Sequence, residues 1–395
     1  MRSIIRSGLT MAAVVAGVIG FAGTAAAASP HSGPWPGSHS GPWPGSHFGR
    51  GAPGDAVFVQ TDNTAGNQVV AYDRGPDGTL TQAGTYSTGG LGGALTGSVV
   101  DHLASQGSLA YDQGNASLYA VNAGSNTVSV FSVVGDHLCL RQVVNSGGTF
   151  PVSVAVRGDL IYVLNAENGG SVQGYDAGFG LLFPIPGSAR PLGLNPAATP
   201  QYTNTPGQVA FSPDGSQLIV TTKANGSDID VFGVGFRGYL SPHPVVNAEP
   251  GTVPFAVTFD GAGHLVVAEA GTNALATFDL LSDGTVGLLD AVPTGKMATC
   301  WIAQAQGYLY ASNAGSGSVS GYGEGPGGQL DLLGATTTDA GTVDAAASPD
   351  GQFLYVQTGG NGIVDEFHVN AGGSLTEVGS VTVPGAVAGE GIVAS

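Results

Sequence analysis

One short pattern recurs seven times between residue 55 and the C-terminus, and it restricts the possible folds more than any other feature. Each copy has an apolar stretch that stops at a turn and a second stretch that ends in an aromatic residue. The clearest copies read YAVNAGSN from Tyr119, YVLNAENG from Tyr162 and YASNAGSG from Tyr310. Weaker copies begin at Phe58, Ile219, Val266 and Tyr355. The aromatic residue follows the start of each copy by 12 to 14 residues, which predicts one β-hairpin per copy.

Each predicted hairpin is flanked by two further strands. Upstream lies an apolar stretch that ends in a turn, as at residues 209–211 before the Ser-Pro-Asp-Gly turn of 212–215. Downstream a fourth stretch follows a glycine turn, such as residues 75–78. Four antiparallel strands in repeats of roughly 45 residues are typical of propeller blades. The sequence therefore predicts an all-β, seven-bladed β-propeller with four-stranded antiparallel blades and no helix.

The two ends of the repeat region are complementary. The first copy lacks its innermost strand, and the chain ends with an extra apolar stretch at residues 391–395. We expect this C-terminal strand to complete blade 1, because closing the ring in this way removes an exposed sheet edge. Truncating these residues is then predicted to destabilise the whole ring.

The N-terminus has the features of a secretory signal peptide. Arg2 and Arg6 precede an apolar stretch at residues 9–22, and small residues at 26–28 form a cleavage site before Ser29. A membrane anchor is the alternative, but the stretch is shorter than the ~20 residues of a spanning helix. We predict that residues 1–28 are removed, which leaves a secreted, extracellular protein without a membrane span.

Residues 29–54 are predicted to be a flexible linker rich in proline, glycine and tryptophan. They contain two copies of HSGPWPGS, at residues 31–46, and a degenerate third copy. Proline and glycine at this density disfavour helices and sheets. The repeated histidines could bind a metal, and Trp35 and Trp43 could stack on a wall polymer. A spacer is the simpler interpretation, because an eight-residue period fixes no coordination geometry. The propeller would then span residues 55–395.

Charge and cysteine content exclude several classes of function. The net charge is −18, and losing Arg2 and Arg6 with the signal peptide would make it −20. A nucleic acid partner is therefore excluded, because binding a polyanion requires clustered lysine and arginine. The two cysteines, Cys139 and Cys300, fall in different blades and are predicted to be free and mostly buried. Two GxGxxG patterns fall in predicted hairpin turns with no helix after them, so they do not indicate a dinucleotide site. We expect no metal, no cofactor and a monomer.

The repeats also carry a family likeness. The run from Tyr119 to Phe131, together with the recurring Ser-Pro-Asp-Gly turns, resembles the lactonase family of seven-bladed propellers. That family includes 6-phosphogluconolactonase-like proteins and fungal carboxymuconate cyclases. The same run is similar to the YVTN surface propellers. The resemblance covers residues 55–395, includes a long loop at 192–205, and implies a lactone hydrolase on a propeller scaffold.

The chain departs from the resembled family at the catalytic positions. The family has His-x-His-Ser at the start of the fourth blade, but residues 205–211 contain no histidine. It has Gly-Pro-Arg-His at the start of the fifth, where this chain has Phe255 and Ala256. Glu269 is the one remnant of the family's Asn-Glu pair. Opening a lactone requires a base and groups that stabilise the developing oxyanion. Whether the protein is an enzyme is therefore left open.

The remaining candidates lie on one predicted face, which is formed by the loops that enter the inner strands and by the central hairpin turns. Both lysines of the chain, Lys223 and Lys296, fall there, which favours a carboxylate or phosphate ligand. His102 could act as a base, oriented by Asp101 or paired with Glu269 across the channel. The predicted catalytic residues are His102 and Glu269, and the predicted ligand-binding residues are Lys223, Lys296, Asp101, Gln208, Asp344 and Glu390.

Two hypotheses of different classes remain. The first is a lactonase-like propeller that binds or hydrolyses a small anionic or sugar-derived lactone. The second is a non-catalytic surface or matrix propeller that acts as an interaction scaffold for proteins or cell-wall polymers. A polar pocket that brings Lys223, Lys296 and His102 together would favour the first, and an empty apolar channel would favour the second.

Overall fold

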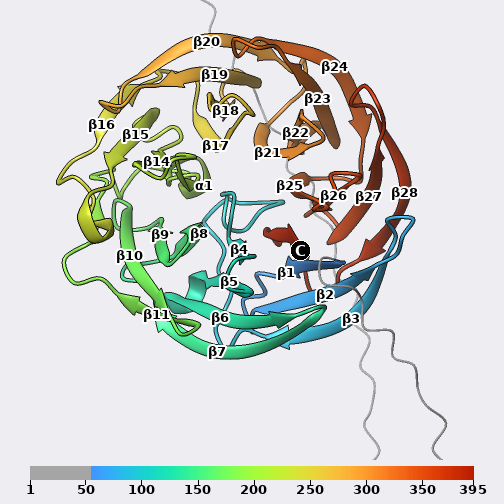
Figure 1. Cartoon of the computed structure of the whole chain (residues 1–395), viewed down its shortest axis with the longest axis horizontal. Helices are drawn as coiled ribbons and strands as arrows, with labels where there is room; N and C mark the ends of the chain where they lie inside the picture. The colour runs from blue at the N-terminus through green and yellow to red at the C-terminus, as the bar shows by residue number, and fades with distance from the viewer. Residues whose placement is uncertain (1–54) are drawn as a thin grey trace, which may run out of the picture. The chain divides into compact units, whose positions relative to one another are not determined.

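The computed structural model describes residues 55–395, so the predicted signal peptide and linker lie outside the described residues. Seven sheets form a closed ring around a central channel (Figure 1). The seven-bladed, four-stranded architecture predicted from the repeats is confirmed. Blade 1 contains β29 (Ile392–Ala394), β1 (Ala56–Gln60), β2 (Gln68–Arg74) and β3 (Leu80–Ser87). Blade 2 contains β4 (Leu109–Asp112), β5 (Ser117–Asn122), β6 (Thr127–Val134) and β7 (His137–Asn145). Blade 3 contains β8 (Pro151–Arg157), β9 (Leu160–Asn165), β10 (Ser171–Gly178) and β11 (Leu181–Pro184), and β12 (Arg190–Pro191) also pairs with β10.

The other four blades repeat the same order from the channel outward. Blade 4 contains β13 (Val209–Phe211), β14 (Gln217–Thr221), β15 (Asp228–Gly233) and β16 (Val245–Ala248), and blade 5 contains β17 (Pro254–Phe259), β18 (Leu265–Glu269), β19 (Ala274–Leu280) and β20 (Val286–Pro293). Blade 6 contains β21 (Thr299–Ala305), β22 (Tyr308–Asn313), β23 (Ser318–Glu324) and β24 (Leu330–Thr337). Blade 7 contains β25 (Thr342–Ala347), β26 (Phe353–Thr358), β27 (Ile363–Val369) and β28 (Leu375–Thr382). The short helices are α1 (Gln201–Asn204) and the 3-10 turns η1 (Ala123–Ser125), η2 (Phe236–Gly238) and η3 (Ala314–Ser316).

The aromatic landmarks of the repeat form the core between blades. All seven are almost completely buried, because each blade packs its faces against two neighbours. In five blades a β-bulge lies directly before the landmark, between the third and fourth strands. A bulge increases local twist, which suits blades packed face to face around a ring. The landmarks are Tyr72, Phe131, Tyr175, Phe232, Phe278, Tyr322 and Phe367.

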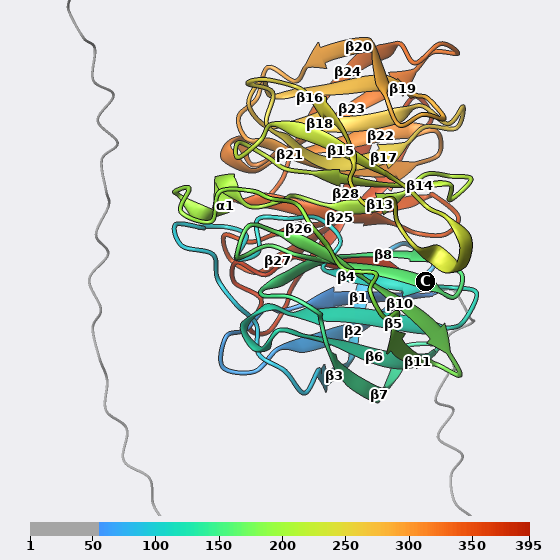
Figure 2. The same cartoon turned by 90° about the vertical axis from the view of Figure 1, so that its left-hand side faces the viewer.

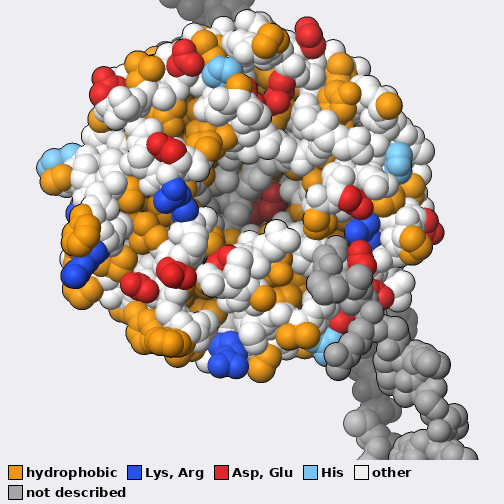
Figure 3. All heavy atoms as spheres, in the orientation of Figure 1, with side chains coloured by type: hydrophobic (Ala, Val, Ile, Leu, Met, Phe, Trp, Pro, Cys, Tyr) orange, Lys and Arg blue, Asp and Glu red, His pale blue; other side chains and the backbone are white. Residues whose placement is uncertain are grey.

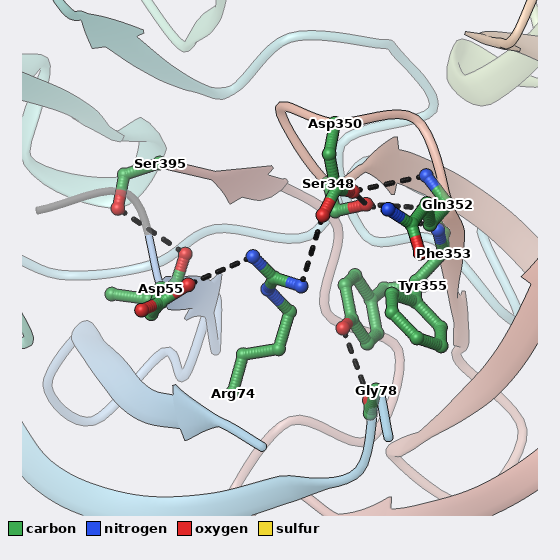
Figure 4. A network of polar contacts seen from close by, with 10 residues as sticks. Asp55, Arg74, Gly78, Ser348, Asp350, Gln352, Phe353, Tyr355 and Ser395 are labelled. Carbon is green, nitrogen blue, oxygen red and sulfur yellow. Dashed lines mark hydrogen bonds and ion pairs between the residues drawn. The ribbon is translucent and has the colours of Figure 1, made fainter. Parts of the chain in front are cut away.

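The ring closes as predicted, with β29 paired antiparallel to β1 in blade 1. At the adjoining seam, Arg74 of blade 1 forms ion pairs with Asp55, at 2.8 Å, and with Asp350 of blade 7, at 3.5 Å (Figure 4). The hydroxyl of Tyr355 in blade 7 donates a hydrogen bond of 3.0 Å to the carbonyl of Gly78 in blade 1. Blade 1 therefore contains strands from both ends of the repeat region, and polar contacts hold it to blade 7.

Two details differ from the sequence expectations. The body contains α1, a single helical turn in the predicted insertion loop, where no helix was expected. Both cysteines are free as predicted, but Cys139 is exposed, so its predicted burial is wrong. Cys139 lies on β7, an outermost strand with an alternating, mostly exposed pattern, whereas Cys300 on the inner strand β21 is buried. Among residues 55–395 no helix is long and apolar enough to cross a membrane.

Candidate functional site

A cavity of about 530 Å³ is lined in part by Tyr202 of α1, and Figure 2 shows α1 on the left-hand side of the propeller. The loop before β4, the β14–β15 turn and the starts of β17 and β21 supply its walls. These walls are chiefly apolar, and the polar groups are few and lie deep. The apolar walls include Val99, Val100, Val253, Phe255 and Trp301, and the buried titratable residues are Asp101, Lys223 and Cys300.

Lys223 is fully buried, and its ammonium group is bound by the protein itself. The Nζ atom donates to the carbonyls of Ala104, at 2.6 Å, and Tyr202, at 2.7 Å, and to the hydroxyl of Thr205, at 3.1 Å. It also lies 5.2 Å from the centre of the Phe255 ring. Burial lowers the pKa of Lys223 to about 7, and the nearby Asp101 carboxylate opposes that shift. An ammonium group has three donors, so none remains for a ligand.

Asp101 lies beside Lys223 at the base of the cavity. Its carboxylate accepts hydrogen bonds from the backbone N–H groups of Leu103, at 2.7 Å, and Ser105, at 3.0 Å. Burial raises the pKa of Asp101 to about 6, while these hydrogen bonds and Lys223 oppose the shift. The carboxylate therefore holds its own loop in shape, and the predicted orientation of His102 by Asp101 has no counterpart among these contacts.

Deeper in the channel, three more buried carboxyl groups lie close to the point where the closing strand β29 begins. Glu390 accepts from the N–H of Gly107 at 3.0 Å and donates its own N–H to Asp62 at 2.7 Å, and its side chain interacts with that of Asp344. Burial raises the pKa of Asp62 to about 8, that of Asp344 to about 7, and that of Glu390 well above its usual value. Acidic side chains are visible inside the central hollow in Figure 3. Mutual repulsion adds to each of these shifts.

The structure does not bring the predicted catalytic residues into the cavity. His102 is half-buried and hydrogen-bonds to the backbone of Asp62, and burial lowers its pKa. Its Nδ1 atom is buried and has no hydrogen-bond partner within residues 55–395. Glu269 ends β18, accepts a hydrogen bond of 2.7 Å from Thr272, and has a pKa that burial raises. Neither side chain lines the cavity.

The predicted ligand-binding residues lie in four different places. Asp101 and Lys223 line the cavity, whereas Asp344 and Glu390 lie in the buried carboxyl cluster of the channel. Lys296 is exposed and does not line the cavity. Gln208 accepts a hydrogen bond of 2.6 Å from the N–H of Val257, which joins blades 4 and 5. The structure therefore assigns Gln208 a contact between blades.

Sequence reasoning missed the two aromatic residues that shape the cavity. Trp301 donates from Nε1 to the carbonyl of Ser105 at 2.6 Å, and its ring lies 5.0 Å from that of Phe255 in an edge-to-face arrangement. Phe255 had been noted only as the residue standing where the resembled family has arginine. The available signal was an aromatic residue at the start of two neighbouring inner strands, since those strands begin at the mouth of the channel.

Comparison with known proteins identifies the class of fold. No protein-family model and no curated protein matches the sequence. Among solved structures, a candidate 6-phosphogluconolactonase of Bacteroides fragilis has 19% identity and a TM-score of 0.65, covering 84% of this chain and 96% of that one. A similar protein of Bacteroides uniformis has 19% identity and a TM-score of 0.67, with 86% and 99% covered. The periplasmic gluconolactonase PpgL of Pseudomonas aeruginosa has 17% identity and a TM-score of 0.67, with 85% and 98% covered. The chain therefore has the fold of a lactonase-like seven-bladed propeller.

Proposed function

We propose that this protein is an exported, lactonase-like propeller that binds a small, predominantly apolar molecule of lactone size without hydrolysing it. The observation that carries the proposal is the cavity of about 530 Å³ at the channel mouth, with apolar walls and a few deep polar groups. Cavities of this size and lining are typical of small-molecule sites. The similar solved structures, which include a gluconolactonase, suggest a lactone as the ligand class.

The polar groups of the cavity support binding over hydrolysis. Hydrolysis would require a base near the ligand and free donors for the oxyanion. The donors of Lys223 are already committed, and His102 does not line the cavity. Burial raises the pKa of the Cys300 thiol to about 12, so this residue is a poor nucleophile at neutral pH. The same arrangement favours an alkyl- or aryl-substituted lactone over an anion or a polyhydroxylated sugar lactone.

Export is part of this proposal and rests on the N-terminal sequence. The two arginines, the short apolar stretch and the small residues before Ser29 support cleavage by a signal peptidase. N-terminal sequencing of protein recovered from the culture medium is expected to begin at Ser29. Protein that stays in the cytoplasm with its N-terminus intact would contradict export.

Ligand binding can be measured through Trp301. The chain has three tryptophans, so a Trp35→Ala/Trp43→Ala background leaves Trp301 as the only one. Titration with an alkyl-substituted δ-lactone is expected to change its fluorescence saturably, while gluconolactone does not. Phe255→Ala should weaken binding about tenfold, which corresponds to ~1.4 kcal/mol of lost contact. Leu288→Ala, at an exposed site on the outer strand β20, is the matched control and should have no effect.

Lactone consumption is followed in the same samples. Ring opening by the wild-type protein that is lost in Phe255→Ala would replace the binding proposal with an enzyme. If none of the lactones changes Trp301 fluorescence, the proposal fails and the scaffold hypothesis takes its place.

A further inference from the structure

A second hollow, of about 690 Å³, opens on the opposite face of the propeller, at the rim between blades 3 and 4. We call it the rim groove. Its walls are the β10–β11 turn and the loop with η2 between β15 and β16, whereas the cavity lies on the face that carries α1 (Figure 2). Hydrophobic side chains gather along this rim near β11 and β16, beside basic ones (Figure 3). Because no contact in the proposed ligand site involves it, the rim groove is a separate feature.

Aromatic rings dominate the exposed surface of the rim groove. Phe179 is 99% exposed, Phe236 on the neighbouring loop is 83% exposed, and Phe183 and Tyr239 are partly exposed. Single exposed apolar residues are common on protein surfaces, but Phe179, Phe183 and Tyr239 all line this one hollow, and Phe236 lies beside its lining residue Arg237. Phe179 also has a φ of 56°, a left-handed conformation that is rare for a bulky residue. The local backbone therefore presents this ring to solvent despite a conformational cost.

The rim groove also carries charges of both signs. Asp159 and Asp176 lie on one wall and Arg237 on the other. The Arg237 guanidinium lies 5.2 Å from the centre of the Phe236 ring. None of these three charges takes part in an ion pair within residues 55–395. Hydrogen-bond acceptors and donors are therefore available on opposite sides of the aromatic surface.

The backbone beside the rim groove is closed to strand addition. The outer edge of β11 is capped by Gln142 of blade 2, which accepts from the N–H of Leu182 at 2.7 Å and donates to its carbonyl at 3.1 Å. A peptide that recognises a free sheet edge would find these groups occupied. Recognition at the rim groove must therefore use ring faces and charged side chains.

We propose that the rim groove binds an uncharged polysaccharide. The C–H face of a pyranose ring is apolar and packs on aromatic rings, and its hydroxyl groups both donate and accept hydrogen bonds. Hydroxyl groups can donate to Asp159 and Asp176 and accept from Arg237, so a neutral, hydroxyl-rich ligand complements both walls. A proline-rich peptide is the other common ligand of aromatic grooves, but it offers mainly carbonyl acceptors and would donate no hydrogen bond to either carboxylate.

The test uses the mature protein with Trp35→Ala/Trp43→Ala, so that the tryptophans of the predicted linker cannot contribute. Co-sedimentation with insoluble cellulose or chitin is expected to remove the protein from solution. Phe179→Ala/Phe236→Ala should reduce the bound fraction at least fivefold, and Asp176→Asn should reduce it less. Val134→Ala, at an exposed apolar site of blade 2, is the matched control and should bind as the parent does. Melting temperatures show that each variant is folded.

Three results would overturn the proposal. The first is no binding of either polymer by the folded parent protein. The second is binding that survives Phe179→Ala/Phe236→Ala, which would place the site elsewhere. The third is saturable binding of a proline-rich peptide that is lost in this variant while neither polysaccharide binds. The lactone titration of Trp301 is unaffected by these variants under the proposal, so the two sites are tested independently.

Discussion

The two sides of the central channel have opposite chemistry. On the side of blades 7, 1 and 2, four buried carboxyl groups lie near the start of the closing strand β29. They belong to Asp62, Asp101, Asp344 and Glu390. On the side of blades 4 to 6, Phe255 and Trp301 form an apolar wall. Lys223, from blade 4, lies next to Asp101, where the two sides meet. The same channel therefore has ionisable carboxyl groups beside the strand that closes the ring and an apolar cavity on the other side.

This difference indicates a division of labour around the channel. The contacts of Glu390 reach blades 1, 2 and 7, so the acidic side holds the ring shut. On the apolar side, Trp301 hydrogen-bonds to the carbonyl of Ser105, and the apolar walls leave an open cavity. Changes on the acidic side should therefore affect the stability of the whole propeller, and changes on the apolar side should mainly affect binding.

Removing the closing strand is expected to have the largest effect. Deletion of residues 391–395 exposes the edge of β1, removes the hydrogen bonds from Gln60 to Gly391 and from Ser395 to Ala56, and opens the site of Ile392. We expect a loss of about 5 kcal/mol or more, and a melting temperature lower by more than about 10 °C. Ile392→Ala, which keeps the strand, should fall between the two proteins at ~2–4 kcal/mol. A truncated protein that melts within about 2 °C of wild type would show that closure contributes little.

The junction of the two sides is tested by the two lysines. Lys223→Met removes the ammonium group that donates to Ala104, Tyr202 and Thr205, and it removes the nearby positive charge that favours the Asp101 carboxylate. The expected cost is ~3 kcal/mol in the free energy of unfolding, measured with denaturant. Lys296→Met is the matched control, because Lys296 is exposed, and should stay within ~0.5 kcal/mol of wild type. Equal stability of the two variants would mean that the buried hydrogen bonds of Lys223 contribute nothing net.

The fold could be predicted from the sequence because propeller blades are local. Each hairpin and each Ser-Pro-Asp-Gly turn is specified by residues close together in the chain, and their repetition gives the blade number. The position of the closing strand could also be predicted, since one unpaired strand and one incomplete blade imply each other. The exposure of Cys139 was not accessible in this way, because burial on an outermost strand depends on which face the neighbouring blade covers.

The site could be predicted only in part, because it is assembled from loops of several blades. Placing Lys223 and Asp101 on one face was possible from the strand order. That Lys223 would be consumed by carbonyls of two other loops was not visible, because backbone carbonyls leave no mark in the sequence. The grouping of Lys296 and His102 with Lys223 failed for a related reason, since a shared face does not set the depth of a side chain.

The pH dependence of stability provides the finest test of the acidic side. Burial raises the pKa of Asp62 to about 8, that of Asp101 to about 6 and that of Asp344 to about 7, and it also raises that of Glu390. The folded protein therefore binds more protons than the unfolded chain between pH 4 and 7. The contribution of these protonated carboxyl groups to stability is complete below about pH 4, and it is lost as the pH rises through their raised pKa values. We expect the free energy of unfolding to fall by at least ~2 kcal/mol between pH 5 and 7.

Two neighbouring bases act in the opposite sense. His102 has a lowered pKa, so its contribution to stability falls as the pH drops below its usual value, and Lys223 does the same below its ordinary pKa, down to about pH 7. Four carboxyl groups outweigh one histidine between pH 5 and 7. Glu390→Gln keeps the shape of the side chain and removes its titration, so its stability should depend less steeply on pH than that of wild type. Asp331→Asn, on the exposed outer strand β24, should keep the wild-type slope. An unchanged slope in Glu390→Gln would show that Glu390 does not contribute to the pH dependence of stability.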